Sequence, residues 1–115
     1  MSRSDEDLNL VFSALSDPVR RRILELLDGE EMLVGEIAAE FEISVQAVSK
    51  HLKVLARAGL VDQEREGRIS RCRLDAGPIY DAALWMNRYS KYWQNQFETL
   101  VAFLPEIDQV KDGGK

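Results

Sequence analysis

The sequence is poor in cysteine and histidine, and it has no long hydrophobic run. Its one cysteine, Cys72, cannot form an intramolecular disulfide and fits a reducing compartment. One histidine and one cysteine are few ligands for a zinc-type site, which uses three or four. No segment approaches the ~20 apolar residues of a membrane span, and the beginning of the sequence is too acidic and polar for a secretory signal. We therefore expect a cytoplasmic protein without a metal or other cofactor.

The sequence also lacks the common signatures of catalysis. There is no glycine-rich phosphate loop, and a lone histidine, cysteine or serine does not make a set of nucleophile, base and orienting group. The length of 115 residues, with 45% apolar and 30% charged side chains, is typical of one globular domain. We expect this domain to cover residues 1–107, followed by a flexible tail at 108–115, and we do not expect an enzyme.

The charge of the chain is unevenly distributed. The net charge of −5 looks unfavourable for a nucleic-acid-binding protein. However, residues 44–73 contain seven cations and three acids, a local charge of +4, whereas the rest of the chain carries −9. The basic segment can contact phosphates, while the acidic remainder faces elsewhere and limits indiscriminate binding.

Residues 44–59 predict an amphipathic helix inside this basic segment. Ser44 is a good N-cap, and Gly59 can end the helix in the left-handed conformation. At ~100° per residue, one side carries an amide and three cations: Gln46, Lys50, Lys53 and Arg57. The opposite arc is apolar: Val45, Val48, Leu52, Leu55 and Ala56. Such a helix suits a DNA major groove, where cations meet phosphates and glutamine pairs with adenine; an ordinary helix with a solvated basic face is the alternative.

The neighbouring segments favour the DNA-binding interpretation. Helical patterns over 5–15, 18–28 and 34–41 come first, and the last of them joins the basic helix through a short link, which predicts a helix-turn-helix. A short extended piece is expected at 31–33. After Gly59 the period changes to two, and strand patterns over 60–66 and 68–74 flank Gly67, which predicts a β-hairpin. A helix-turn-helix followed by such a hairpin is a winged helix.

The tip of this predicted wing carries Arg65 and Arg68. Both are well placed for the sugar–phosphate backbone or an adjacent minor groove, and the alternative is a role in solubility and edge-strand protection. Cys72 shares a strand face with Leu74, which predicts a partly buried, unreactive thiol rather than a redox switch. For most of the arginine run at 20–22 we expect solvated surface or pairing with carboxylates, and the alternative for one of the three is contact with a phosphate.

A last helix is predicted over 79–104, stopped by Pro105. A helix of ~26 residues spans ~39 Å, more than so small a domain can cover. Its surplus apolar surface predicts a homodimer through the first and last helices; an aromatic ligand pocket is the alternative. The residues expected at the dimer interface are Leu8, Val11, Phe12, Trp85, Tyr89, Tyr92, Trp93 and Leu100.

These segments, in this order, resemble the ArsR/SmtB family of winged-helix transcriptional repressors. The resemblance rests on ALSDPVRRRILELL (14–27), SVQAVSKHLKVLARAGLV (44–61) and the wing EGRISRCRL (66–74). It implies a homodimer, joined through the first and last helices, that binds a palindromic operator. The DNA-reading positions of the family fall at Ser44, Gln46, Ala47, Ser49, Lys50 and Lys53. With Arg57, Arg65 and Arg68 these residues form the expected DNA-binding set.

The sequence departs from the metal-sensing members of that family. Two positions that hold cysteines in those members are Leu33 and Gly35 here, and Asp81 on the last predicted helix has no histidine after it. The resemblance is therefore to the metal-less branch. His51 flanks the reading face of the basic helix, so we expect it to position that helix or to contact a phosphate rather than to bind a metal.

Together these patterns predict a mainly α fold with a small β-hairpin, a winged helix-turn-helix that dimerises through its first and last helices. The predicted function is a homodimeric, metal-independent repressor that binds double-stranded DNA at a palindromic operator, with no membrane partner. An unknown small-molecule effector between the aromatic last helices is a further hypothesis. The alternative function is a winged-helix module that binds a partner protein, and the acidic net charge is its best support.

Overall fold

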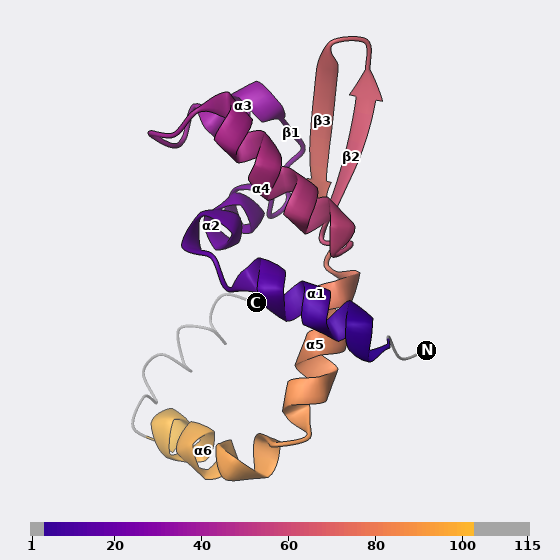
Figure 1. Cartoon of the computed structure of the whole chain (residues 1–115). Helices are drawn as coiled ribbons and strands as arrows, with labels where there is room; N and C mark the ends of the chain where they lie inside the picture. Colours follow the sequence, from indigo (N-terminus) through magenta and orange to yellow (C-terminus); the bar gives the residue numbers. More distant parts are fainter. Residues whose placement is uncertain (1–3, 103–115) are drawn as a thin grey trace. The chain divides into compact units, whose positions relative to one another are not determined.

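The chain folds mainly into helices with one small antiparallel sheet, which confirms the predicted fold class (Figure 1). A computed structural model describes residues 4–102. The elements are α1 (Asp5–Leu15), α2 (Pro18–Leu26), β1 (Met32–Leu33), α3 (Val34–Ala38), α4 (Val45–Arg57), β2 (Val61–Glu66), β3 (Ile69–Leu74), α5 (Gly77–Asn87), the 3₁₀ turn η1 (Ser90–Tyr92) and α6 (Gln94–Ala102). They fall into two compact units, of which the first ends at Ala83 and the second begins at Leu84.

Side-chain caps fix where α2 and α4 begin. The Ser44 hydroxyl accepts a hydrogen bond from the N–H of Ala47 (3.1 Å), as the sequence predicts. The Asp17 carboxylate accepts from the N–H groups of Val19 and Arg20 (2.8 and 3.2 Å). These bonds satisfy backbone donors that have no partner inside the helix, and such a cap contributes about 1 kcal/mol.

Two glycines with positive φ separate α4, β2 and β3. Gly59 has a φ of 78° and follows α4, where the N–H of Leu60 returns to the carbonyl of Leu55 (2.9 Å). Gly67 has a φ of 60° and is the first of two turn residues between β2 and β3, the position at which a two-residue hairpin turn with a single positive φ requires glycine. Both glycines confirm the predicted ends of these elements.

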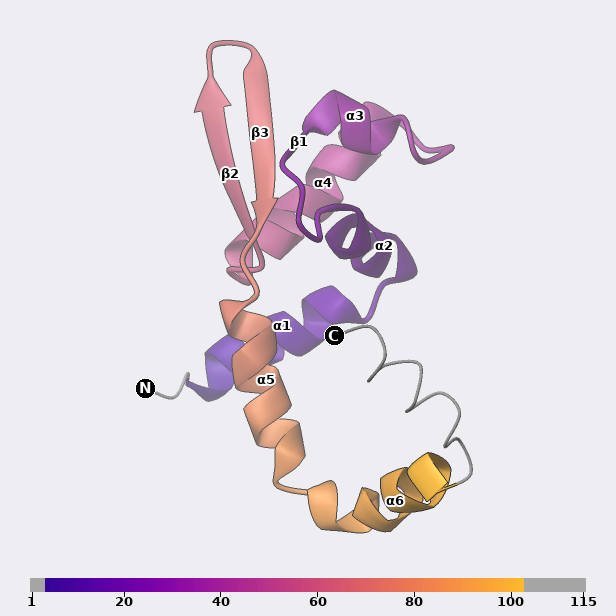
Figure 2. The same ribbon diagram turned by 180° about the vertical axis from the view of Figure 1, so that it is seen from behind.

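β3 is the middle strand of a three-stranded antiparallel sheet with the order β1-β3-β2. The hairpin pairs Val61 with Leu74, and on the other edge Met32 of β1 lies opposite Cys72 (Figure 2). The sequence predicted the hairpin and an extended piece at 31–33, but not that this piece pairs with the hairpin. The pairing ties the root of the hairpin to the segment that leads into α3.

A hydrophobic core holds α4 against the other elements of the first unit. Val48, Leu52 and Leu55 of α4 have no exposed surface. The buried side chains around them include Val11, Ala14, Ile23, Leu27, Ile37, Leu60, Cys72 and Ala82. Burying an aliphatic side chain of this size contributes roughly 1.5–3 kcal/mol. The core therefore fixes which side of α4 is left for solvent.

Val45 departs from the apolar arc that the sequence predicted. Its side chain is 51% exposed, so the prediction that it points into the core is wrong. Val45 is the first residue of α4, and α3 ends at Ala38 instead of the predicted Phe41. The shorter α3 leaves the first turn of α4 uncovered on this side.

The predicted single helix over 79–104 is wrong. The structure breaks this segment into α5, η1 and α6, and no side chain from Leu84 to Ala102 is buried. Helices in proteins are stabilised mainly by packing of their apolar face, and aromatic residues lose rotamer freedom in a helix. An uncovered, aromatic-rich segment therefore has little to hold it in one long helix. The predicted stop at Pro105 and the tail at 108–115 lie outside the described residues, and the single domain over 1–107 stays a prediction.

Within residues 4–102, none of the helices combines the length and the apolar character that crossing a membrane requires.

Candidate nucleic-acid interface

The side of α4 opposite the core carries the predicted amide and cations. Four exposed side chains recur at intervals of three or four residues, which places them along one side of a helix: Gln46, Lys50, Lys53 and Arg57. Ser44 is exposed as well, although its hydroxyl serves as the helix cap. Ala47 and Ser49 are half-buried on the two flanks. The structure thus brings the predicted α4 residues to one exposed surface.

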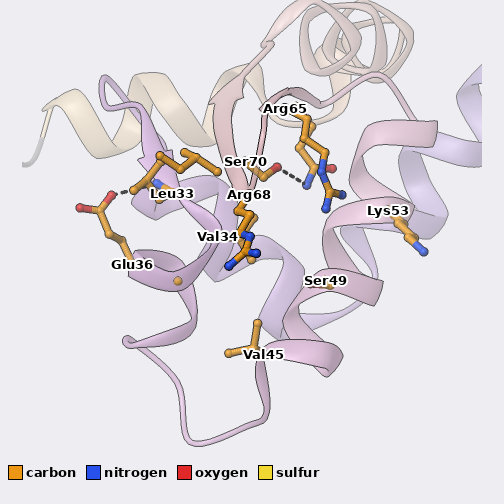
Figure 3. A pocket seen from close by; sticks show the side chains of 12 residues that line it. Leu33, Val34, Glu36, Val45, Ser49, Lys53, Arg65, Arg68 and Ser70 are labelled. Carbon is orange, nitrogen blue, oxygen red and sulfur yellow. Dashed lines mark hydrogen bonds between the residues drawn. The ribbon is translucent and has the colours of Figure 1, made fainter.

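An open groove of about 970 Å³ separates this helix from the wing, the β2–β3 hairpin (Figure 3). Ser49 and Lys53 of α4 line one side of the groove, and Arg65 and Arg68 extend into it from the hairpin. The groove therefore joins the α4 part and the wing part of the predicted DNA-binding set.

The remaining lining of the groove is largely apolar. Val34, Val45 and Ile69 contribute side chains from α3, α4 and β3. Glu36 of α3 also lines the groove, and its carboxylate accepts a hydrogen bond from the N–H of Leu33 (2.8 Å). This carboxylate is therefore used to cap α3.

Two of the seven cations in the basic segment are held by carboxylates. Arg71 lies 3.8 Å from Glu31 and 3.7 Å from Glu66. Arg73 lies 2.9 Å from Asp62 and 3.7 Å from Glu31. The hydrogen bond with Asp62 and the charges of Asp62 and Glu31 raise the pKa of Arg73 above its ordinary value. Both guanidinium groups are therefore largely neutralised by neighbours on the sheet.

The other five cations have no carboxylate within 4 Å among the described residues: Lys50, Lys53, Arg57, Arg65 and Arg68. Arg65 only donates a long hydrogen bond to the carbonyl of Gly67 (3.4 Å). All five were predicted from the sequence to contact DNA. Their common property, that no acid neutralises them, could not be read from the sequence, because Glu31 lies far from the wing along the chain.

The sequence predicted solvated surface or carboxylate pairing for most of the arginines at 20–22, and the structure shows that the side chain of Arg20 is half-buried. Its Nη1 lies 3.3 Å from Nδ1 of His51 on α4. Burial opposes ionisation of the neighbouring Asp17, but the N–H donors of Arg20 and Val19 and the charge of Arg20 help to outweigh it, so the pKa of Asp17 is lowered. Because Arg20 and His51 are far apart in the chain, no local pattern predicted this contact.

Cys72 is completely buried in the middle strand. Burial raises the pKa of its thiol to about 11, which agrees with the predicted unreactive thiol. Nowhere in residues 4–102 do three or more histidine, cysteine, aspartate or glutamate side chains gather in a way that suits a metal ion. Metal independence stays a prediction.

The residues predicted for a dimer interface differ in their exposure. Val11 has no exposed surface and belongs to the core, so it has nothing to contribute to an interface, and that part of the prediction is wrong. Leu8 is half-buried. The others are exposed: Phe12, Trp85, Tyr89, Tyr92, Trp93 and Leu100. Trp85 and Tyr89 contact each other with ring centroids 5.5 Å apart.

The chain is similar in sequence and fold to several transcription regulators. A helix-turn-helix domain family matches residues 15–64. The transcriptional repressor SdpR of Bacillus subtilis (strain 168) is 40% identical over 79 residues, which cover 69% of this chain and 88% of SdpR. The HTH-type transcriptional regulator Rv2034 of Mycobacterium tuberculosis (H37Rv) is 42% identical over 101 residues, which cover 88% of this chain and 89% of Rv2034. The crystal structure of the ArsR family transcriptional regulator RHA00566 matches with a TM-score of 0.74 at 29% identity, over 82% of this chain and 97% of the other.

Proposed function

The chain belongs to the ArsR family of winged-helix, DNA-binding transcription regulators, and we propose that it acts in the cytoplasm as a homodimeric repressor at a palindromic operator. In this proposal α4 enters the major groove and the wing contacts the adjacent backbone. The DNA-binding residues are Ser44, Gln46, Ala47, Ser49, Lys50, Lys53, Arg57, Arg65 and Arg68.

The observation that carries this proposal is the group of five cations on α4 and the wing, none of which has a carboxylate within 4 Å among residues 4–102. Cations of this kind release counterions when they meet phosphates, which drives binding to DNA and makes it depend on salt. Gln46 lies on the same side of α4 as Lys50 and Lys53. It is therefore placed to reach base edges, where glutamine forms a paired hydrogen bond with adenine.

The salt dependence of binding tests the roles of the lysines. We expect Lys50→Ala and Lys53→Ala to weaken binding to a mixed-sequence duplex of about 30 base pairs, and each to reduce the slope of log K against log salt by ~0.9. Fluorescence anisotropy at several salt concentrations measures both quantities. The matched control is Arg22→Ala on α2, which also removes one exposed positive charge, but one that already lies 3.5 Å from Glu25. Equal losses for the control and the lysine variants would contradict the proposed contacts.

Base preference tests Gln46 with an operator selected from random duplexes. Gln46→Ala should cost ~1–3 kcal/mol on the operator and little on random DNA, because only the base contact is lost. Equal losses on both duplexes would remove Gln46 from the reading role. No salt-dependent binding to any duplex would instead favour the alternative function, a module that binds a partner protein.

Exposed apolar side chains support the proposed homodimer. Tyr92 is 67% exposed and Leu100 is 53% exposed, and exposed apolar surface of this kind marks an interaction site. A second copy is the proposed occupant, because a twofold dimer places two α4 helices on half-sites about one DNA turn, ~34 Å, apart. A palindromic operator follows from that symmetry.

Repression by this chain is supported by the relative named a transcriptional repressor. The direct test deletes the gene and measures transcription from promoters that contain the selected operator, which repression predicts will rise.

For metal independence, we expect operator affinity to stay constant when Zn²⁺ or Cd²⁺ is added or removed by a chelator. A small-molecule effector would act at the aromatic segment that includes Trp85 and Tyr89, by changing the spacing of the two α4 helices.

A further inference from the structure

Arg20, at the start of α2, contacts both α1 and α4 through all three nitrogens of its guanidinium group. Nε donates to the carbonyl of Ala14 (2.8 Å), and Nη2 donates to the carbonyl of Ser13 (3.1 Å). These carbonyls lie at the end of α1, where the positive charge is also favourable for the helix dipole. Nη1 lies 3.3 Å from Nδ1 of His51, in the middle of α4.

The chemistry of the guanidinium and imidazole groups determines which of them donates in the hydrogen bond between Arg20 and His51. A guanidinium group has five N–H donors and no acceptor. Nδ1 of His51 must therefore be the acceptor, which requires a neutral imidazole with its proton on Nε2. The N–H of the ring then lies on the side of the imidazole away from Arg20.

We propose that Arg20 holds His51 in its Nε2–H form so that this N–H donates a neutral hydrogen bond to a DNA phosphate next to the one that Lys50 contacts. The proposal rests on the DNA-binding function proposed above. His51 directly follows Lys50 and lies on the flank of α4 between the core and the exposed cations. Within residues 4–102, Arg20 is the one hydrogen-bond partner of its half-buried ring. Arg20 is thus a positioning residue, and His51 is an additional phosphate contact that brings no charge.

Two charged groups lie near the ring: Arg20 faces Nδ1, and Asp17 interacts electrostatically with Arg20 at the start of α2. The Asp17 carboxylate itself is occupied by the N–H groups of Val19 and Arg20. It therefore orients the start of α2, and with it the Arg20 side chain.

Nitrogen NMR on the free protein tests the contact without DNA. His51 is the one histidine in the chain, so ¹⁵N-histidine labelling gives the signals of a single ring. We expect Nδ1 to resonate as an unprotonated, hydrogen-bonded nitrogen and Nε2 as a protonated one. Arg20→Met should shift the Nδ1 signal. The matched control is Arg21→Met, because Arg21 also caps α1, through the carbonyl of Leu15 (2.8 Å), whereas the contact with His51 comes from Arg20. A proton on Nδ1 in the wild type, or equal shifts in both variants, would overturn the proposal.

Three variants of His51 test the phosphate contact. In His51→Gln the amide nitrogen comes close to the position of Nε2 and can still donate, whereas in His51→Asn and His51→Ala no donor reaches it. We expect the Gln variant to retain most of the affinity for the mixed-sequence duplex and the other two to lose roughly fivefold to tenfold. Because a neutral donor releases no counterion, the salt slope should stay that of the wild type in all three.

The outcomes separate this proposal from the proposed function. A wild-type protein that binds no duplex would contradict both. If the wild type shows salt-dependent binding and His51→Ala binds with the same affinity, only the phosphate contact is contradicted. Equal affinities of His51→Gln and His51→Asn would also contradict only that contact. These variants leave Arg20 in place, so the comparison decides the proposal even where Arg20→Met lowers the stability of the fold.

Discussion

Arg68 and Arg71 are three residues apart in the chain and have different surroundings. Arg71 lies within 4 Å of Glu31 and Glu66, whereas Arg68 lines the groove between α4 and the wing. An exposed ion pair contributes only ~0–1 kcal/mol to stability. The main effect of the pairing is therefore on the surface potential, because the two carboxylates offset the positive charge of Arg71, whereas no carboxylate of residues 4–102 lies within 4 Å of Arg68.

The environment of Cys72 makes its thiol a test of the packing around the middle strand. Burial raises its pKa to about 11, from an ordinary value of 9.0, and the side chain has no exposed surface. We expect the Cys72 thiol of the native protein at pH 8 to react with a thiol reagent only as fast as the fold opens and exposes it. In guanidinium chloride, where the protein is unfolded, the thiol should react at once. Rapid reaction of the native thiol would contradict this burial.

The same shift predicts how stability changes at high pH. The folded protein keeps the thiol proton to a higher pH than the unfolded chain, so this contribution to stability is complete below pH 9 and is lost as the pH rises towards 11. Denaturation of the wild type and of Cys72→Val, measured between pH 8 and 11, isolates the effect, since other groups titrate equally in both. Parallel stability curves for the two proteins would contradict it.

At the scale of the element, the hairpin turn is the feature that places the wing cations. Gly67 has a φ of 60°, and no atom lies within 4 Å of the position that a Cβ would take. A substitution there is therefore opposed by the backbone conformation and not by a clash. The turn sets the positions of Arg65 and Arg68, because one precedes Gly67 by two residues and the other follows it directly.

Substitution of Gly67 should weaken both the fold and the binding of DNA. Gly67→Ala is expected to cost ~1–2 kcal/mol of unfolding free energy, the cost of a left-handed conformation for an L-residue, and to reduce duplex affinity as the turn moves Arg65 and Arg68. Gly67→Asn should cost less, since asparagine tolerates this conformation better. Urea denaturation and anisotropy measure the two effects. An alanine variant with wild-type stability and affinity would show that the turn does not position the wing.

The elements that the sequence predicted well are those with local signals. The start of α4 depends on Ser44, its end on Gly59, and the hairpin on Gly67, and each acts within a few residues of itself. The errors arise where residues that are distant in the sequence determine the structure of a segment. The pairing of β1 with β3 joins residues 40 positions apart, the exposure of Val45 depends on where α3 ends, and the break after α5 depends on the absence of packing against it.

At the scale of the whole molecule, self-association is the main prediction. We expect light scattering to give about twice the 13.1 kDa of one chain at micromolar concentration. Tyr92→Ser should shift the equilibrium towards monomer with little change in the helical content, because Tyr92 is 67% exposed and loses little packing within its own chain. The matched control is Tyr80→Ser on α5, since Tyr80 is 65% exposed but is not in the predicted interface. A monomeric wild type would contradict the dimer.

The sequence predicted which residues form the candidate site, but it did not predict which contacts these residues make. The cation pattern of α4 and the wing gave Lys50, Lys53 and Arg68, because helix and strand periods place such residues on one side of an element. It left Arg73 out of the DNA-binding set, but it did not predict that Asp62 and Glu31 pair with this arginine. It also could not place Arg20 beside His51, since that contact depends on how α1, α2 and α4 pack.

The pairing of β3 gives different parts of the wing different mobility. Arg71 and Cys72 have strands on both sides, whereas Ile69 and Ser70 near the turn pair with β2 alone. Backbone amides at the root should therefore exchange with deuterium slowly, and those at the tip quickly. If α4 and the wing bind DNA as proposed, a mobile tip would let the outer arginines adjust to minor grooves of different width while α4 keeps its register on the bases.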